Sequence, residues 1–130
     1  MRFAILVNQS PYQYQASDTA YRFTHAALAA GHEVVRVFFY HDGVYNGNRL
    51  NAPPQDERDI GQMWQSLARD HGVELAICVA AGQRRGVLDK AESQRLEKAG
   101  SNLADEFRIT GLGQWVEAMV EADRVMVFGG

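Results

Sequence analysis

Five short apolar runs, separated by segments with helical spacing, constrain the fold of this 130-residue chain more than any other feature. They span residues 2–7, 33–40, 75–81, 107–110 and 124–128. Continuous apolar runs of this length are typical of strands buried on both faces. Because such strands alternate with helices, we expect a flavodoxin-like, three-layer α/β/α fold with a mainly parallel sheet of about five strands.

The segments between these runs predict four helices and one long loop. The predicted helices cover residues 17–31, 56–72, 89–99 and 113–120, and the loop covers residues 41–55. Asp89 resembles the N-cap of a capping box, and Gly31 and Gly72 are suitable helix stops. No linker or repeat is visible, and the length suits one domain, so we expect residues 1–130 to fold as a single unit.

Composition narrows the class of protein. Hydrophobic residues make up 46% of the chain, charged residues 22%, and the net charge is −3, which is typical of a globular protein without a basic face for nucleic acid. No apolar run is long enough to span a membrane. A single cysteine excludes an internal disulfide, and with four scattered histidines it argues against a metal site. We expect a cytoplasmic protein whose thiol stays reduced.

Cys78 is the only cysteine, and it lies near the end of the third apolar run. Catalytic groups of parallel α/β folds gather at the carboxyl ends of strands. Arg84 and Arg85 follow closely, and positive charge favours a thiolate, so one of them could lower the pKa of Cys78 and hold the anionic outer sulfur of a persulfide. The alternative is a buried cysteine that acts as a small apolar residue, with solvated or ion-paired arginines. His41 is a further candidate partner for the thiol.

Two other chemistries are less well supported by the sequence. The spacing from Cys78 to Arg84 matches the phosphate loop of tyrosine-phosphatase-like enzymes, but Arg85 replaces their serine or threonine, and residues 79–81 resemble continuing strand. The segment Gly111–Gly113 lacks the third glycine of a dinucleotide-binding motif and is better explained by close packing at a helix start. The aromatic residues 38–40 and Tyr45 are interpreted as core and loop packing or as a subunit interface.

The order and spacing of several motifs resemble the DsrE/TusD family of small sulfur-relay proteins along almost the whole chain. These motifs are Met1–Ile5, Val37–Tyr40, Gly43–Asn46, Ile77–Ala81, Arg84–Gly86, Ser101–Leu103, Gly111–Gly113 and Asp123–Val125. The resemblance implies a compact α/β/α fold in which Cys78 accepts sulfane sulfur as a persulfide and passes it to a partner protein. Thiol–persulfide exchange of this kind requires neither a metal nor an organic cofactor.

The resemblance also implies partners. DsrE-like chains assemble with DsrF-like and DsrH-like subunits in a heterohexamer that holds two of each, and they supply a DsrC-like acceptor during oxidation of stored sulfur in the cytoplasm. Overall similarity favours this branch. Two alternatives remain open: a TusD-like relay for 2-thiouridine formation in tRNA, and a structural subunit whose partner carries the active thiol. Neither branch requires direct contact with nucleic acid or with a membrane.

Overall fold

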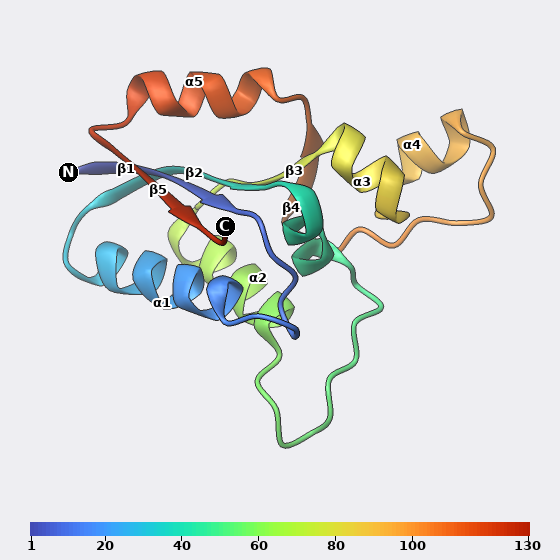
Figure 1. The fold of residues 1–130 in the computed structure, drawn as a ribbon, viewed down its shortest axis with the longest axis horizontal. Coiled ribbons are helices and arrows are strands. Elements are labelled where there is room, and N and C mark those ends of the chain that lie inside the picture. Colours follow the sequence, from blue (N-terminus) through green and yellow to red (C-terminus); the bar gives the residue numbers. More distant parts are fainter.

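A computed structural model describes all residues 1–130 and contains one sheet of five strands (Figure 1). The strands are β1 (Arg2–Val7), β2 (Glu33–Phe39), β3 (Leu75–Cys78), β4 (Phe107–Thr110) and β5 (Arg124–Phe128). They lie in the order β4-β3-β2-β1-β5, and every neighbouring pair is parallel. The predicted parallel sheet is therefore confirmed.

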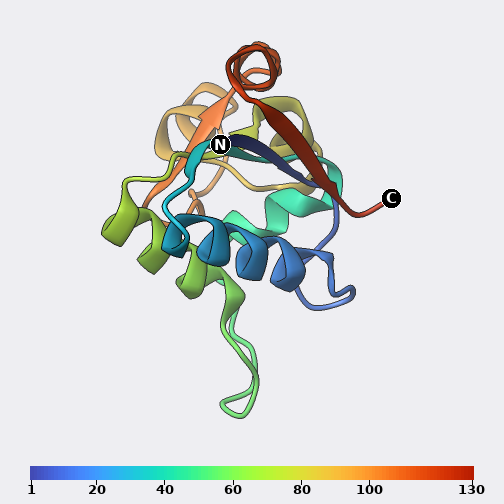
Figure 2. The ribbon, with the colours of Figure 1, turned by 90° about the vertical axis from the view of Figure 1, so that its left-hand side faces the viewer.

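Helices cover both faces of this sheet. The helical elements are α1 (Ala16–Ala29), the 3-10 helix η1 (His41–Gly47), α2 (Ile60–His71), α3 (Val79–Arg85), α4 (Lys90–Arg95) and α5 (Gly113–Glu121). Consecutive residues of a strand point to opposite faces. Phe39 packs on Trp64 of α2 with ring centroids 5.3 Å apart, and Phe38 packs on Trp115 of α5 at 6.0 Å. The helices α1 and α2 thus form one outer layer and α5 the other (Figure 2).

The core is one cluster of 23 buried residues, and its largest members come from the predicted strands, from α2 and from α5. Phe38 and Phe39 are fully buried. The interpretation of these two rings as part of a subunit interface is therefore wrong, because they fill the two sides of their own sheet. Tyr40 and Tyr45 are half-buried and pack against the core.

The third apolar run departs from its prediction. The strand ends at Cys78, and residues 79–85 form α3 instead of continuing the strand. Alanine is the strongest helix former, and Ala80 and Ala81 stand at the start of this segment. Gly82 permits the return of the chain, because a Cβ there would lie 2.7 Å from the carbonyl oxygen of Val87. Gly86, with φ of +71°, then ends the helix.

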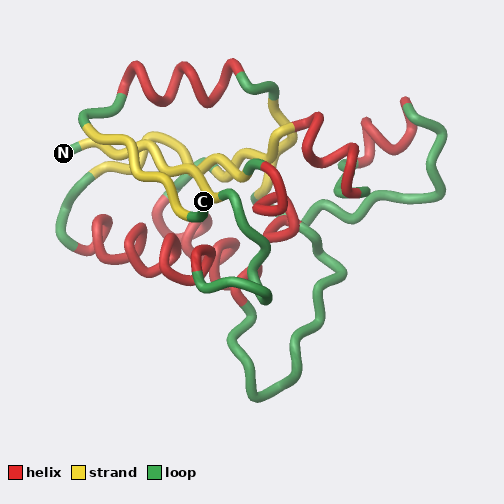
Figure 3. The backbone as a smooth tube through the Cα atoms, viewed as in Figure 1, coloured by secondary structure: helices red, strands yellow, loops and turns green.

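The other helices differ from their predictions mainly at their ends. Asp89 caps α4 as predicted by accepting a hydrogen bond from the Glu92 amide, but α4 ends at Arg95 instead of near Ala99, since Glu97 adopts a left-handed φ of +56°. The helix α2 begins at Ile60, after its cap Asp59. A long loop, residues 48–59, separates η1 from α2 and extends from the body of the molecule (Figure 3).

Candidate functional site

Cys78 ends β3 at the carboxyl edge of the sheet, where the sequence places it. It is a free cysteine, it is only 3% exposed, and it stands directly before the first residue of α3. Ala76 is paired with Phe38 through the sheet, so Ala76 and Cys78 share the face covered by α5. The thiol is thus buried on the same face of the sheet as α5.

Thr110 is the polar side chain that the fold brings beside this thiol. It is paired with Cys78 across β3 and β4, so the two side chains share a face on strands about 4.8 Å apart. The Thr110 Oγ1 atom is buried and has no hydrogen-bond partner. An unpaired buried hydroxyl is costly, and it leaves a donor free for an atom added to the thiol. Thr110 is not among the site residues predicted from the sequence, and its position at the end of a predicted strand was the one available signal.

The Arg85 side chain binds other groups and not the thiol of Cys78. Its Nε donates to Asp42 Oδ1 at 2.6 Å and its Nη1 to the Ala81 carbonyl at 3.1 Å, so it ties α3 to η1. Arg84 is exposed on the last turn of α3. With a rise of 1.5 Å per residue, Arg84 begins about 9 Å along the helix from Cys78. Neither arginine donates a hydrogen bond to the thiol, and their support of a thiolate or persulfide stays a prediction.

The structure lacks the phosphate-binding loop that the phosphatase-like interpretation requires. Residues 79–85 form a helix, and Gly82 is buried against Val87, so the chain does not wrap around a common centre between Cys78 and Arg84. The conclusion drawn from the sequence stands. Of its two reasons, the replacement of serine or threonine by Arg85 holds, but the continuing strand is wrong, because residues 79–85 are helical.

His41 is exposed at the start of η1, where its φ is +47°. Its ring packs over Tyr40, with centroids 4.2 Å apart, and it makes no hydrogen bond to Cys78. The segment Gly111–Gly113 is also not closely packed, because a Cβ at Gly111 or Gly113 would meet nothing within 4 Å. The close-packing interpretation of these glycines is therefore wrong, and the turn beside Thr110 is open.

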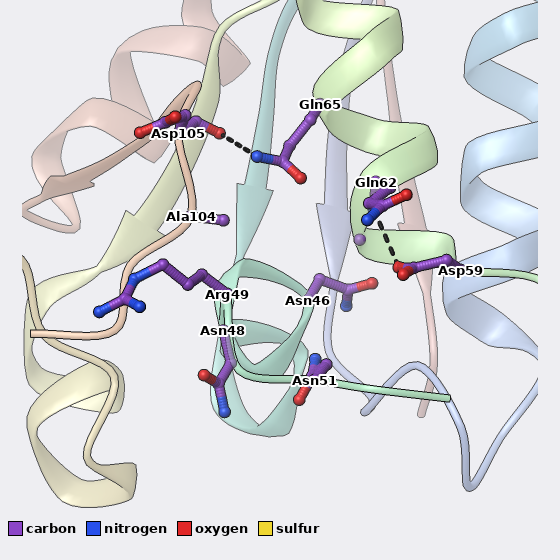
Figure 4. A pocket seen from close by; sticks show the side chains of 10 residues that line it. Asn46, Asn48, Arg49, Asn51, Asp59, Gln62, Gln65, Ala104 and Asp105 are labelled. Atoms are coloured by element: carbon purple, nitrogen blue, oxygen red, sulfur yellow. Dashed lines mark hydrogen bonds between the residues drawn. The ribbon is translucent and has the colours of Figure 1, made fainter. Parts of the chain in front are cut away.

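A polar cavity of about 240 Å³ lies between the start of α2 and the loop before β4 (Figure 4). Amide and carboxylate side chains line it, but most of them already bind the surrounding backbone. Gln65 donates to the Asp105 carbonyl at 3.1 Å, and Asp59 accepts from the Gln62 amide at 3.2 Å. Asn51 donates to the Tyr45 carbonyl at 2.7 Å. The cavity lining therefore holds loops together, and Cys78 is not part of it.

Two further features bear on the class of protein. No three His, Cys, Asp or Glu side chains gather in a way that could hold a metal ion. None of the helices combines the length and the apolar character needed to cross a bilayer.

A three-layer fold with one buried thiol at the carboxyl edge of its parallel sheet defines a class of small α/β thiol proteins. Residues 1–128 match the model of the DsrE/DsrF-like family, and the chain belongs to that family. It is 54% identical to DsrE of Allochromatium vinosum, a candidate sulfurtransferase by name, over 99% of both chains. It is 48% identical to the sulfurtransferase TusD of Salmonella typhi, over 98% of this chain and all of that protein.

The fold has a counterpart among solved structures. The crystal structure of the YchN protein from E. coli superposes with a TM-score of 0.80 and covers 98% of this chain and 99% of its own. Its sequence identity is 22%, so this likeness concerns the fold alone. The predicted family and fold are both confirmed.

Proposed function

We propose that this chain is a sulfurtransferase of a sulfur relay, which takes up sulfane sulfur as a persulfide on Cys78 and passes it to a partner protein. The observation that carries the proposal is the single thiol at the carboxyl edge of the sheet, in a chain about half identical to two relatives named for sulfur transfer. One thiol is sufficient, because the donor and acceptor thiols belong to other proteins.

The chemistry balances without a cofactor. The Cys78 thiolate attacks the outer sulfur of a donor persulfide, the sulfur–sulfur bond of the donor breaks, and the donor leaves as a thiolate. Cys78 then carries the persulfide. In the second step an acceptor thiolate attacks the outer sulfur, and the Cys78 thiolate is the leaving group. No net oxidation or reduction occurs in either step.

Access is the structural requirement of this proposal. Cys78 is almost fully buried, so a partner thiol reaches it only if a covering segment moves. We assign this movement to the turn at 111–113, which follows Thr110, is not packed around its glycines and exposes 48% of Leu112. Adding the outer sulfur also moves the reacting atom outward by one bond of about 2 Å.

Thr110 and the two arginines have separate roles in the proposal. The free hydroxyl of Thr110 donates a hydrogen bond to the outer sulfur, because no protein group occupies it. Arg84 and Arg85 raise the positive charge at the far end of α3, and Arg84, which is exposed, also meets the incoming partner. Arg85 acts less directly, since its Nε already binds Asp42.

The proposed setting is the cytoplasm, with DsrF-like and DsrH-like subunits in a heterohexamer holding two of each and a DsrC-like acceptor. The higher identity to DsrE than to TusD favours oxidation of stored sulfur over tRNA thiolation. Purified acceptors separate the two branches: a DsrC-like carrier should receive sulfur from the loaded chain faster than a TusE-like carrier. The reverse order would favour the TusD-like alternative.

Mass spectrometry after incubation with a persulfidated donor tests the central step. We expect the wild type to gain the mass of one sulfur atom on the peptide that holds Cys78, and Cys78→Ser to gain none. Cys78→Ala serves as a second variant, and circular dichroism checks that both fold. Equal loading of wild type and Cys78→Ser would contradict the proposal. Undiminished relay by an assembled complex carrying Cys78→Ser would favour the structural-subunit alternative.

A further inference from the structure

Tyr40 stands beside Cys78 at the carboxyl edge of the sheet. Phe39 of β2 is paired with Ile77 of β3, so the residues that follow them are neighbours across these two strands. Those residues are Tyr40 and Cys78, and both have extended backbones. Because side chains alternate along an extended strand, Tyr40 shares a face with Phe38, which contacts α5, and this is also the face of Cys78.

Cys78 thus lies between two side chains that carry hydroxyl groups. Thr110 is on β4 and Tyr40 is on β2, and each of these strands is about 4.8 Å from β3. The Thr110 Oγ1 atom is buried without a hydrogen-bond partner, and the hydroxyl of the half-buried Tyr40 forms no hydrogen bond within the chain. Polar groups in packed regions are usually hydrogen-bonded, so two unpaired hydroxyls that flank one thiol call for an explanation.

The backbone of Tyr40 is fixed on both sides. Its N–H donates to the Val7 carbonyl at 2.9 Å, and its carbonyl accepts from the Gly43 amide at 2.8 Å. Gly43 in turn lies directly against β1, since a Cβ there would be 2.0 Å from the Val7 carbonyl oxygen. Tyr40 is therefore held between β1 and η1, and a group on a fixed backbone is suited to position a reacting atom.

His41 restrains the ring of Tyr40. The two rings are stacked with centroids 4.2 Å apart, and the φ of His41 is +47°, in the left-handed region where residues other than glycine are uncommon. Backbone strain of this kind persists only where the surroundings hold it, and it clusters at functional sites. Here the strained turn places the His41 ring over the Tyr40 ring, which limits the rotation of the Tyr40 side chain.

The two side chains reach different distances from the sheet. A tyrosine carries its hydroxyl several ångströms farther from the backbone than a cysteine carries its sulfur, and no hydrogen bond joins the Tyr40 hydroxyl to the Cys78 thiol. A persulfide places its outer sulfur about 2 Å beyond the thiol sulfur, which is nearer to the level of the hydroxyl. The Tyr40 hydroxyl is therefore better placed for the loaded state of Cys78 than for the free thiol.

We propose that Tyr40 is a further residue of the transfer site, whose hydroxyl donates a hydrogen bond to the outer sulfur of the Cys78 persulfide. The inference rests on the proposed function, since it concerns the loaded state of that thiol. Hydrogen bonds to an ionised group are stronger than those between neutral groups, so the donor favours the ionised persulfide. Thr110 donates from β4 and Tyr40 from β2, and the outer sulfur lies between them.

The hydrogen bond alters neither the bonds nor the electrons of the transfer. The acceptor thiolate attacks the outer sulfur, the sulfur–sulfur bond breaks, and its electron pair leaves with the Cys78 thiolate. The acceptor then carries the persulfide, and the Tyr40 hydroxyl keeps its proton throughout. The effect of Tyr40 is on the persulfide before transfer, which ionises at a lower pH when a donor stabilises its anion.

Tyr40→Phe tests this role, because it removes the hydroxyl and keeps the ring that packs on His41. Mass spectrometry follows the alkylation of the outer sulfur against pH in persulfide-loaded wild type and Tyr40→Phe. We expect the midpoint to rise by about 0.7 pH unit in Tyr40→Phe, which corresponds to a fivefold change in the ionisation equilibrium. The midpoint of the unloaded thiol should be the same in both proteins. Equal midpoints for the two loaded proteins would overturn the inference.

Tyr45→Phe is the matched control. Tyr45 is also half-buried and belongs to η1, but it lines a hollow with residues 10–13 and Asn51. Its replacement should leave both midpoints unchanged, and a shift equal to that of Tyr40→Phe would contradict a specific role of Tyr40. A wild type that takes up no sulfur on Cys78 would contradict the proposed function itself. A Tyr40→Phe variant that loads normally and unfolds at a lower temperature, without a shifted midpoint, would make Tyr40 a packing residue only.

Discussion

The two edge strands of the sheet, β4 and β5, differ in what covers them. β4 is short, α3 packs beside it, and Arg108 forms an ion pair with Glu74, the residue before β3. It ends at Thr110, next to the buried Cys78. β5 is packed by α1 on one face, but on the other face Val125 and Val127 are exposed.

This difference separates two requirements of a relay protein. A carried persulfide must be sheltered from stray thiols, and Cys78 is buried beside β4, which α3 packs against. A surface for a partner subunit must expose apolar atoms before assembly. The four predictions below test the closed side against the open one, beginning with the largest effect.

Adding one methyl group at Gly43 should cause the greatest loss of stability. A Cβ at this buried glycine of η1 would lie 2.0 Å from the Val7 carbonyl oxygen, so the backbone must shift. We expect Gly43→Ala to lower the free energy of unfolding by about 3 kcal/mol, measured by urea denaturation. Gly111→Ala, in open space, should change it by no more than about 0.5 kcal/mol. Equal effects of the two would show that η1 is not tightly packed against β1.

Replacing a buried arginine of the central strand β2 should lower stability more than replacing the exposed arginine of β5. Arg36 is 7% exposed and binds both Glu74 and the Gln114 carbonyl, whereas Arg124 of β5 is exposed and its side chain donates only to the neighbouring Asp123 carbonyl. Removing a buried charged partner is costly, so we expect Arg36→Met to lower the free energy of unfolding by about 2 kcal/mol. Arg124→Gln should stay within about 0.5 kcal/mol. Urea denaturation compares the two variants, and similar losses of the free energy of unfolding would refute the contrast.

Thr110→Val should have opposite effects on stability and on function. Replacing an unpaired buried hydroxyl by a methyl group removes a desolvation cost, so the free energy of unfolding should rise by up to about 1 kcal/mol. The Cys78 persulfide would lose its donor, and its lifetime against a small-molecule thiol should fall about fivefold. Thr110→Ser should keep the wild-type lifetime. An unchanged lifetime in Thr110→Val would remove Thr110 from the proposed site.

The smallest expected effect is the pH dependence of stability that comes from Glu92. Hydrogen bonds from Arg95 and then Gln83 lower the pKa of the Glu92 carboxyl from its ordinary value of 4.5. A carboxyl whose pKa is lower in the folded state stabilises the fold above its unfolded pKa, and this contribution is lost as the pH falls through the folded pKa. Because Gln83 belongs to α3, we expect acid to weaken the attachment of α4 beside the site. Glu92→Gln should show a flatter loss of stability below pH 4.5 in thermal unfolding, and a slope equal to that of the wild type would contradict this.

The strands and the position of Cys78 could be predicted because both depend on local patterns. Apolar runs mark strands, and parallel strands bring their carboxyl ends together. The run 75–81 was misread at Val79, since hydrophobicity alone does not separate a strand from an alanine-rich helix. Thr110 was missed because its place beside Cys78 depends on the register of two strands that lie about 30 residues apart in the chain.

By itself, the sequence determined the layers of the molecule, the number of strands and the single thiol available for exchange, because hydrophobic periodicity and residue identity are local properties. Only the tertiary structure decided which strands became edges. The run 124–128 resembles a strand buried on both faces, yet β5 lies outermost beside β1, and Arg85 is bound to Asp42. Neighbours in space are chosen by packing between distant segments, so exposure at Val127 and burial at Cys78 could not be read from one run alone.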